Sequence, residues 1–181
     1  MIIRAHLRIA LMLLAASVLG LGSANYIAGG YSAETNGPWR IWRSGVMPDQ
    51  SPYVLAYFAA RGALSPDTNQ MAVFTATTDS DGNDLDGDCV YVVSGTLPPA
   101  RWWSLGIVGD ASRVLSSGNV ITGADGAFSA HVSAQAMPSN WLALPNDGDF
   151  ELVLRFHGPT GLLKDNPQRA GLPAIRKAEC P

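Results

Sequence analysis

The residues best suited to hold a metal ion or to transfer protons gather in one short stretch. Five of the ten residues from Asp79 to Asp88 are aspartates, in a chain that has only 15 acidic residues. Such a cluster can ligate calcium, supply catalytic carboxylates, or form a solvated turn between two strands. Residue type alone allows all three, so the spacing has to decide between them.

The spacing does not fit a calcium-binding EF-hand. A loop that begins at Asp79 would need Gly at its sixth position and a bidentate Glu at its twelfth, where this chain has Asp84 and Val90. The stretch also lies between two strand-like runs, and the Asp-Gly-Asn at residues 81–83 strongly favours a turn. We therefore predict a β-hairpin with a solvated acidic tip, and no metal site.

Other residue types that commonly catalyse reactions lack suitable partners. His131 falls with Ser129 and Ser133 on the polar side of one strand-like run. His157 falls with Arg155 on the polar side of another. The chain has no G-x-S-x-G elbow for a serine nucleophile and no glycine-rich phosphate loop. The sequence thus predicts no catalytic residue and no cofactor, with a hydrolase acting on ester or glycan substrates as the alternative.

Aromatic residues supply the candidates for ligand binding. Trp102 and Trp103 are adjacent, so they should point to opposite faces of a strand, one filling the core and the other partly exposed. Asn140 and Trp141 place an amide, which can donate and accept hydrogen bonds, beside a flat amphipathic ring. We expect any ligand site near these two, with Trp102, Trp103 and Arg155 as contributors. The competing interpretation, which we favour, is that Asn140 shapes a turn and Trp141 plugs the end of the core.

Short strands must position these residues. Beyond Gly62 the apolar pattern has a period of two, and turns rich in Gly, Pro and Asp separate the runs. This pattern is typical of an all-β protein, an antiparallel β-sandwich. The strand-like runs cover residues 71–78, 89–95, 101–109, 127–134 and 150–158.

One short helix is predicted at residues 51–62. Ser51 can cap its start, Pro52 suits the first turn, and Gly62 suits the position after its end. Its apolar residues recur at helical spacing, so we expect it to pack on the sheet.

The first 30 residues differ from the rest and allow two interpretations. A signal peptide would use the uncharged run Ile9–Ala24 and be cleaved after Ala24. A membrane anchor would extend to Gly29, giving about 20 residues, enough to span a bilayer. We favour the anchor, a transmembrane helix, and expect an anchor at 1–30, an extended lead-in at 31–50 and the sandwich domain at 51–181. In both cases the basic start stays in the cytoplasm and the remainder is exported.

Composition limits the partners. Hydrophobic residues make up 47% of the chain and charged residues 15%, and the 12 basic residues are scattered. Without a basic face the chain is not expected to bind nucleic acid. Removing Arg4 and Arg8 with the N-terminal segment leaves 10 basic and 15 acidic residues, a net charge of −5 for the exported part.

The two cysteines, Cys89 and Cys180, lie far apart and have no CxxC spacing or histidine neighbours that would suggest zinc. In an oxidising compartment they would form one disulfide, closing a long loop and tying the tail to a central strand. Two unpaired thiols are the alternative.

Six motifs occur in order along the chain, followed by a cysteine near the C-terminal end. They are "NGPWR" from Asn36, "SPYVLAYFAARG" from Ser51, "TTDSDGNDLDGDCVYVVSG" from Thr77, "PPARWWSL" from Pro98, "NWLALP" from Asn140 and "LVLRFHGP" from Leu152.

Together these motifs resemble the domain-of-unknown-function family 1214, in its short form with an N-terminal membrane segment. The resemblance implies a β-sandwich of jelly-roll type and supports the pairing of Cys89 with Cys180. The family's usual Asn-Trp-Leu-Pro is altered here, because Ala143 replaces the proline, so that loop is expected to be less rigid. No activity is agreed for the family.

From these observations we expect a single-pass inner-membrane protein whose domain lies in the periplasm and acts as an envelope binding or structural module. A soluble periplasmic protein, released by signal cleavage, is the alternative localisation. The expected partners are the membrane, through the N-terminal helix, and an envelope protein or glycan.

Overall fold

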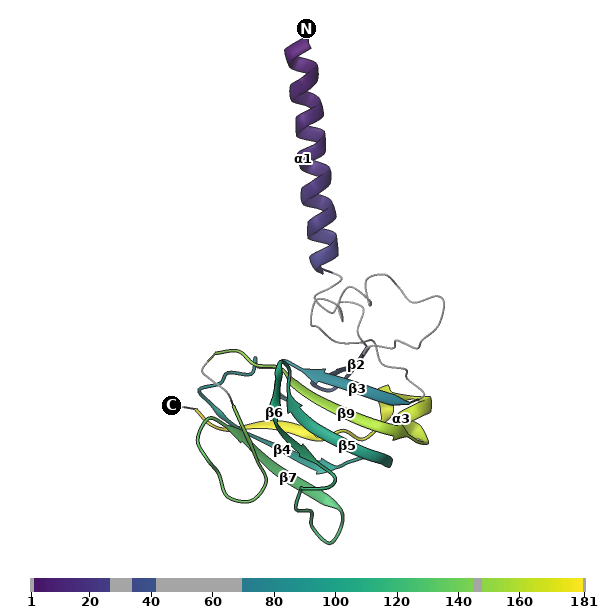
Figure 1. Ribbon diagram of the computed structural model, residues 1–181, viewed down its shortest axis with the longest axis vertical. Coiled ribbons are helices and arrows are strands. Elements are labelled where there is room, and N and C mark those ends of the chain that lie inside the picture. Colours follow the sequence, from purple (N-terminus) through teal and green to yellow (C-terminus); the bar gives the residue numbers. More distant parts are fainter. Residues whose placement is uncertain (1, 27–33, 42–69, 145–147, 181) are drawn as a thin grey trace. The chain divides into compact units, whose positions relative to one another are not determined.

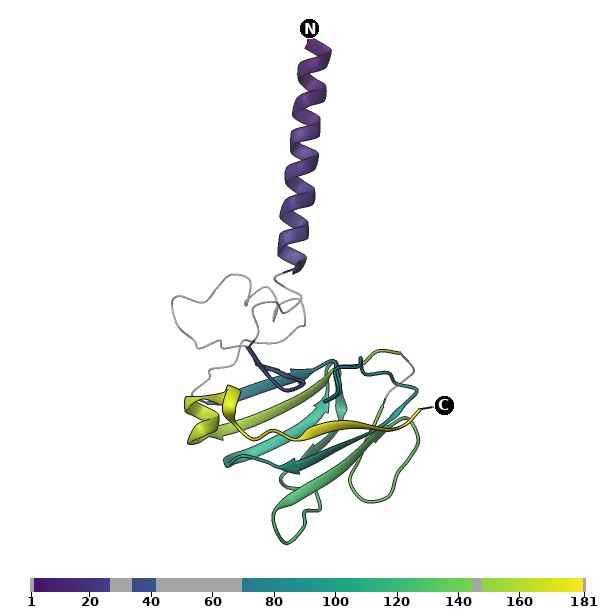
Figure 2. The ribbon, with the colours of Figure 1, turned by 180° about the vertical axis from the view of Figure 1, so that it is seen from behind.

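The computed structural model describes residues 2–26, 34–41, 70–144 and 148–180 (Figures 1 and 2). The chain divides into two compact units, and the β-domain comprises residues 33–47 and 66–181. The helix expected at 51–62 lies outside the described residues, as do Trp42 and most of the expected lead-in.

The N-terminal unit contains one long helix, α1 (Ile2–Tyr26). Its segment His6–Ser23 has a mean hydropathy of 1.6, and none of that segment is buried. The hydroxyls of Ser17 and Ser23 donate to carbonyls within the helix, so they add little polarity to its surface. At 1.5 Å per residue, 25 residues extend about 37 Å, enough to cross the roughly 30 Å of a bilayer's hydrocarbon core. A signal sequence near an N-terminus has the same properties, so α1 is an apolar helix suited to either role.

The larger sheet of the β-domain has six strands in the order β1-β2-β3-β9-β5-β6, and every neighbouring pair is antiparallel. The strands are β1 (Glu34–Asn36), β2 (Trp39–Ile41), β3 (Met71–Ala76), β5 (Ala100–Ile107), β6 (Asp110–Ser116) and β9 (Leu152–Pro159).

The smaller sheet has four strands in the order β10-β4-β7-β8. Its β7 and β8 pair in parallel, whereas the other neighbours are antiparallel. Figure 1 shows β5 and β6 of the larger sheet in front, and the reverse view of Figure 2 brings β10 forward. The strands are β4 (Val90–Thr96), β7 (Ala127–Ser133), β8 (Trp141–Ala143) and β10 (Ala174–Glu179).

The core lies between the two sheets and confirms the predicted β-sandwich. On β9 the alternating residues Leu152, Leu154 and Phe156 are all fully buried, as the period of two requires. Phe156 meets Phe74 of β3 edge to face, with ring centroids 5.9 Å apart. Each fully buried side chain of this size contributes roughly 1.5–3 kcal/mol of hydrophobic stabilisation.

A short helical connection links β9 to β10 and ties the first hairpin to the domain. It consists of α3 (Leu162–Asp165) and a 3₁₀ turn, η2 (Pro167–Arg169), which the sequence analysis did not predict. The Asn36 amide donates to the carbonyls of Pro167 and Ala170, at 3.0 and 2.7 Å.

The acidic stretch is a turn, but the predicted hairpin is wrong. β3, which precedes it, belongs to the larger sheet, and β4, which follows it, belongs to the smaller one. Residues 77–89 therefore cross between the sheets. Inside this crossing segment a tight turn brings Thr78 opposite Asp84 in an isolated antiparallel bridge.

A disulfide joins Cys89 and Cys180, as expected, with 4.3 Å between their Cα atoms. Cys89 immediately precedes β4, and Cys180 immediately follows β10, which pairs with β4. The bond thus fastens the C-terminal edge strand to the interior strand beside it.

Candidate functional site

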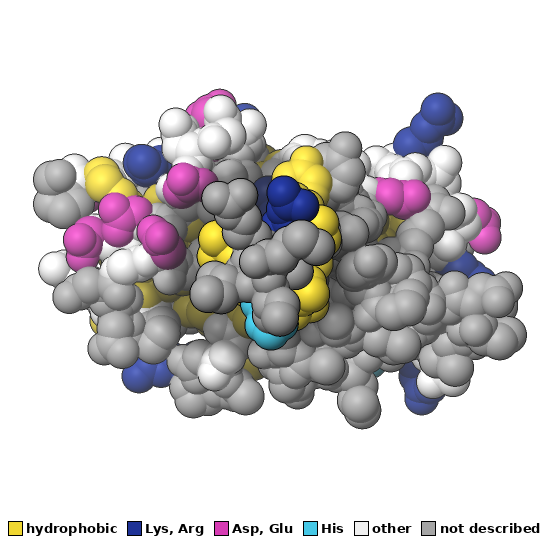
Figure 3. Space-filling model, turned by 90° about the horizontal axis from the view of Figure 1, so that it is seen from above, with side chains coloured by type: hydrophobic (Ala, Val, Ile, Leu, Met, Phe, Trp, Pro, Cys, Tyr) yellow, Lys and Arg dark blue, Asp and Glu magenta, His cyan; other side chains and the backbone are white. Residues whose placement is uncertain are grey.

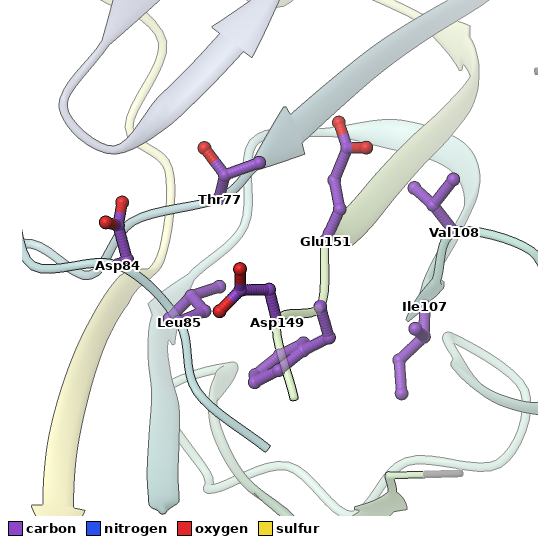
Figure 4. Close-up of a pocket in the computed structure, with 8 residues that line it drawn as sticks. Thr77, Asp84, Leu85, Ile107, Val108, Asp149 and Glu151 are labelled. Carbon is purple, nitrogen blue, oxygen red and sulfur yellow. The ribbon is translucent and has the colours of Figure 1, made fainter. Parts of the chain in front are cut away.

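A cavity of about 460 Å³ opens between the crossing segment, the end of β5 and the residues that lead into β9 (Figure 4). Cavities of this volume are typical of small-molecule sites. The cavity is lined by Thr77, Asp84, Leu85, Ile107, Val108, Asp149, Phe150 and Glu151.

Backbone hydrogen bonds hold the three walls of the cavity together. The Leu85 N–H donates to the Thr77 carbonyl at 2.9 Å, which closes the turn inside the crossing segment. The Val108 N–H donates to the Glu151 carbonyl at 2.9 Å, which joins the end of β5 to the residue before β9. Asp86 and Asp149 form an isolated antiparallel bridge between the remaining walls.

Asp79 explains why the crossing segment folds as it does. Its side chain is only 2% exposed, although four neighbouring aspartates of the stretch are solvated to a greater degree. Its Oδ1 accepts the backbone N–H groups of Asp81 and Asn83, each at 2.9 Å, and the Asn83 amide also donates to this carboxylate. Ser80, next along the chain, exchanges two hydrogen bonds with Ile175 of β10. One aspartate thus organises the turn from inside.

The pKa of Asp79 is lowered from its ordinary value. Burial raises the pKa, but the hydrogen bonds from Asn83 and from the Asp81 N–H, with the charge of Lys177, lower it by more. Asp79 does not line the cavity, so this shift serves the turn.

The cavity combines an acidic rim with an apolar interior. Figure 4 shows the three acidic side chains that line the cavity: Asp84 comes from the crossing segment, and Asp149 and Glu151 come from the residues that lead into β9. Leu85 and Ile107 are buried beneath it, and the described lining includes no lysine or arginine. Acidic side chains also gather on the left of Figure 3, the side on which the C-terminus lies in Figure 1. The arrangement favours a cation that carries an apolar part.

The described residues contain no group of three or more His, Cys, Asp or Glu side chains arranged to hold a metal ion.

Asn140, a predicted ligand contact, uses its amide within the domain. Its Oδ1 accepts the Ile121 N–H at 2.7 Å, and its Nδ2 donates to the carbonyls of Ile121 and Ser129, at 2.7 and 3.0 Å. The side chain is 5% exposed. These bonds fasten the β6–β7 connection to β7, which is the turn-shaping role that the competing interpretation predicted.

Trp141 is partly buried on the edge strand β8. Its Nε1 donates to the carbonyl and hydroxyl oxygens of Ser133, at 3.1 and 3.2 Å. The Arg113 guanidinium lies 5.5 Å from the indole centroid, a cation–π geometry. The ring therefore braces the β7–β8 edge with part of its surface still open.

Trp102 and Trp103 point to opposite faces of β5, as predicted. Trp103 packs against the core, with its ring 5.2 Å from that of Phe128. Trp102 is 39% exposed, and its ring lies 4.9 Å from the His157 ring. Arg155 faces the same way as His157, and its pKa is lowered by burial.

The structure therefore separates the five predicted ligand contacts into three places. Asn140 and Trp141 are neighbours at β8, Trp103 faces the core, and Trp102 shares the outward face of the larger sheet with Arg155. The acidic cavity was not predicted. Its signal in the sequence was the run Asp149-Phe150-Glu151, in which two acidic residues flank an apolar ring; all three residues line the cavity.

The fold and the site define the class of protein. It is a two-sheet β-sandwich whose C-terminal strand is fastened by a disulfide, and the chain also has an apolar N-terminal helix. Residues 70–161, just over half of the chain, match the model of a family described as "protein of unknown function (DUF1214)". The chain belongs to this family. No curated protein matches it.

Two solved structures are similar to this chain. The VPA0106 protein from Vibrio parahaemolyticus aligns with a TM-score of 0.61 and 18% identity, over 90% of this chain and 43% of that one. An uncharacterised protein from Burkholderia cenocepacia aligns with a TM-score of 0.49 and 14% identity, over 87% of this chain and 40% of that one. This chain thus spans less than half the length of either protein. At such identity the first likeness shows the fold alone.

Proposed function

We propose that this protein is a binding domain held at the periplasmic face of the inner membrane by its N-terminal helix. The length and hydropathy of α1 support the anchor, and the Cys89–Cys180 disulfide supports an oxidising compartment. In this proposal residues 1–30 are the anchor. β1 and β2 lie within residues 31–50, the expected lead-in, but they belong to the larger sheet and are therefore part of the domain.

The acidic cavity is the observation that carries the binding role. Asp84 and Asp149 are exposed, so each attracts a cation through solvent and contributes only weakly to affinity. The buried Leu85 and Ile107 beneath them can remove apolar surface of a ligand from water, which contributes about 25 cal/mol per Å². The ligand that satisfies both parts is a small organic cation with an alkyl or aryl body.

The test is calorimetric titration of the full chain, in a nonionic detergent, with hexyltrimethylammonium. Uncharged 1-hexanol and anionic hexanoate serve as matched probes. We expect the ammonium compound to bind most tightly, with an affinity that falls as salt is added.

Replacing both rim carboxylates, Asp84→Asn with Asp149→Asn, should weaken binding of the ammonium probe by roughly two- to tenfold, the range for exposed ion pairs. The matched control is Asp165→Asn in α3, which lies outside the cavity lining. Equal affinity for all three probes, or no effect of the double variant, contradicts the proposal.

A glycan hydrolase is the second candidate, because Asp84 and Asp149 line one cavity from two different segments, and glycoside hydrolysis uses a pair of carboxyl groups. Release of nitrophenol from aryl glycosides and aryl esters, abolished in the Asp84→Asn, Asp149→Asn double variant, would support it over the binding role.

A further inference from the structure

A second, smaller cavity lies at the other end of β5 from the acidic one. It measures about 240 Å³ and lies between the β4–β5 and β6–β7 connections, and we call it the Trp103 slot. This volume is below the range of about 300–1,000 Å³ that is typical of sites for whole drug-sized ligands. The slot therefore suits a single ring.

Its walls are aromatic and proline rings. Trp103 and Phe128 line one side, with their planes 37° apart, and both pack on the core, which fixes their position. Pro98 and Pro99 line the slot as well, and they bring no backbone N–H. The Pro99 carbonyl accepts the Thr160 hydroxyl at 3.2 Å, which fixes this connection from outside.

Two hydroxyl groups are the polar side chains of the slot. Ser117 Oγ accepts a long hydrogen bond of 3.5 Å from the Trp103 N–H, which leaves its own O–H able to donate. The Thr122 hydroxyl makes no hydrogen bond with another described residue, and hydroxyls both donate and accept. The described lining carries no charged side chain.

The slot is preformed, because the loop that carries Thr122 is fixed. Asn140 holds Ile121, its neighbour, by two hydrogen bonds of 2.7 Å. Thr122 itself pairs with Phe128 in an isolated antiparallel bridge. A ligand would therefore not have to order the loop on binding.

We propose that the Trp103 slot binds one ring of a neutral sugar. The apolar face of a pyranose stacks on the Trp103 indole, and its hydroxyls exchange hydrogen bonds with Ser117 and Thr122. The absence of charge along the described lining disfavours an acidic or amino sugar, because its charge would lose water without gaining a partner. The slot shares no lining residue with the acidic cavity, so the proposal does not rest on the cation-binding role.

The experiment uses the full chain in a zwitterionic detergent without a sugar headgroup, since a maltoside would compete. The probes are the methyl glycosides of glucose, galactose and mannose, with glucuronic acid and cyclohexanol as charged and apolar counterparts. Ligand-observed saturation-transfer NMR measures binding and reports which ring protons face the protein. We expect at least one neutral glycoside to bind with a Kd on the order of 1 mM, corresponding to roughly 4 kcal/mol.

Substitutions locate the bound ring. Trp103→Phe should weaken glycoside binding about tenfold, and the matched control is Trp102→Phe, its neighbour on the opposite face of β5. Thr122→Val keeps the branched shape, removes the hydroxyl, and should weaken binding about fivefold to tenfold. Its matched control is Thr35→Val on the exposed surface of β1.

The proposal is overturned if no neutral glycoside shows saturable binding, or if cyclohexanol or glucuronic acid binds as well as the glycosides do. It is also overturned if both slot variants bind like their controls while their thermal unfolding is unchanged. Failure of the ammonium titration at the acidic cavity leaves these outcomes unaffected, so the two proposals fail separately.

Discussion

At the scale of single residues, Asp79 and Asn140 play the same part in two different loops. Each is buried, and each uses its side chain to satisfy backbone groups that the turn around it would leave unpaired. Composition alone marked both segments as turns, because Asp and Asn favour them. Which of the five aspartates turns inward could not be predicted, since that depends on β10, a strand about 95 residues later that contacts Ser80.

Asp79 should make the stability of the domain depend on pH. Its folded-state pKa is lowered below the ordinary 3.8, so the stabilisation is complete above that pH and is lost as the pH falls through the folded-state pKa. Asp79→Asn, which does not titrate, should remove this part of the acid destabilisation. Urea unfolding at neutral and acidic pH measures the effect, and the exposed Asp81→Asn is the control. An unchanged pH dependence in Asp79→Asn would show that this carboxylate does not hold the turn.

Asn140 should matter for stability whether or not a ligand binds nearby. Asn140→Ala removes the acceptor of the Ile121 N–H and the donor to the Ile121 and Ser129 carbonyls, which should lower the free energy of unfolding by about 1–3 kcal/mol. Hydrogen exchange at the Ile121 amide should accelerate more than exchange on β9. Gln135→Ala, an exposed side-chain removal on the β7–β8 connection, is the comparison. Full stability in Asn140→Ala would leave ligand contact as the better explanation for this amide.

At the scale of elements, the alternating pattern located the main strands, but it did not assign them to sheets. The pleat fixes which residues of one strand share a face, and that information is local. The partner of a strand is set by distant residues: β3 pairs with β9, so that Phe74 lies opposite Leu154. Turn-forming residues between β3 and β4 suggested a hairpin because a tight turn and a crossing between sheets use the same residue types.

The disulfide should stabilise the edge strand β10 and, through it, the crossing segment. Closing a loop of this length contributes roughly 4–5 kcal/mol in the chain-entropy model. The paired substitution Cys89→Ser with Cys180→Ser should therefore lower the free energy of unfolding by about 2–5 kcal/mol. Hydrogen exchange should rise first in β10 and at Ser80, which bonds to Ile175. Reduced wild-type protein is the control, and an unaltered urea midpoint in both would contradict the prediction.

At the scale of the whole molecule, two features suggest where the protein lies in the cell. One is the apolar helix α1, and the other is the Cys89–Cys180 disulfide. Exposed apolar side chains cover most of the segment from His6 to Ser23 of α1, a property that a membrane span and a signal sequence share. The disulfide is typical of proteins from an oxidising compartment. Both features can be predicted from the sequence alone, because hydropathy and the number of cysteines depend on composition rather than on long-range packing.

We expect the chain to keep its N-terminal helix. The uncharged run continues beyond Ala24 to Gly29, so that an anchor of about 20 residues is available. Ala24→Leu would block signal cleavage at that position by removing the small residue that it needs. If α1 is an anchor, the masses of the variant and the natural chain in the membrane fraction should differ only by the Ala-to-Leu substitution, and both should resist extraction with alkaline carbonate. Leu14→Arg, which places a charge at the helix centre at a cost of about 2.5–3.5 kcal/mol, should reduce insertion of both. A natural chain whose mature form begins at Asn25, while Ala24→Leu accumulates at greater mass, would establish a cleaved signal and a soluble periplasmic domain.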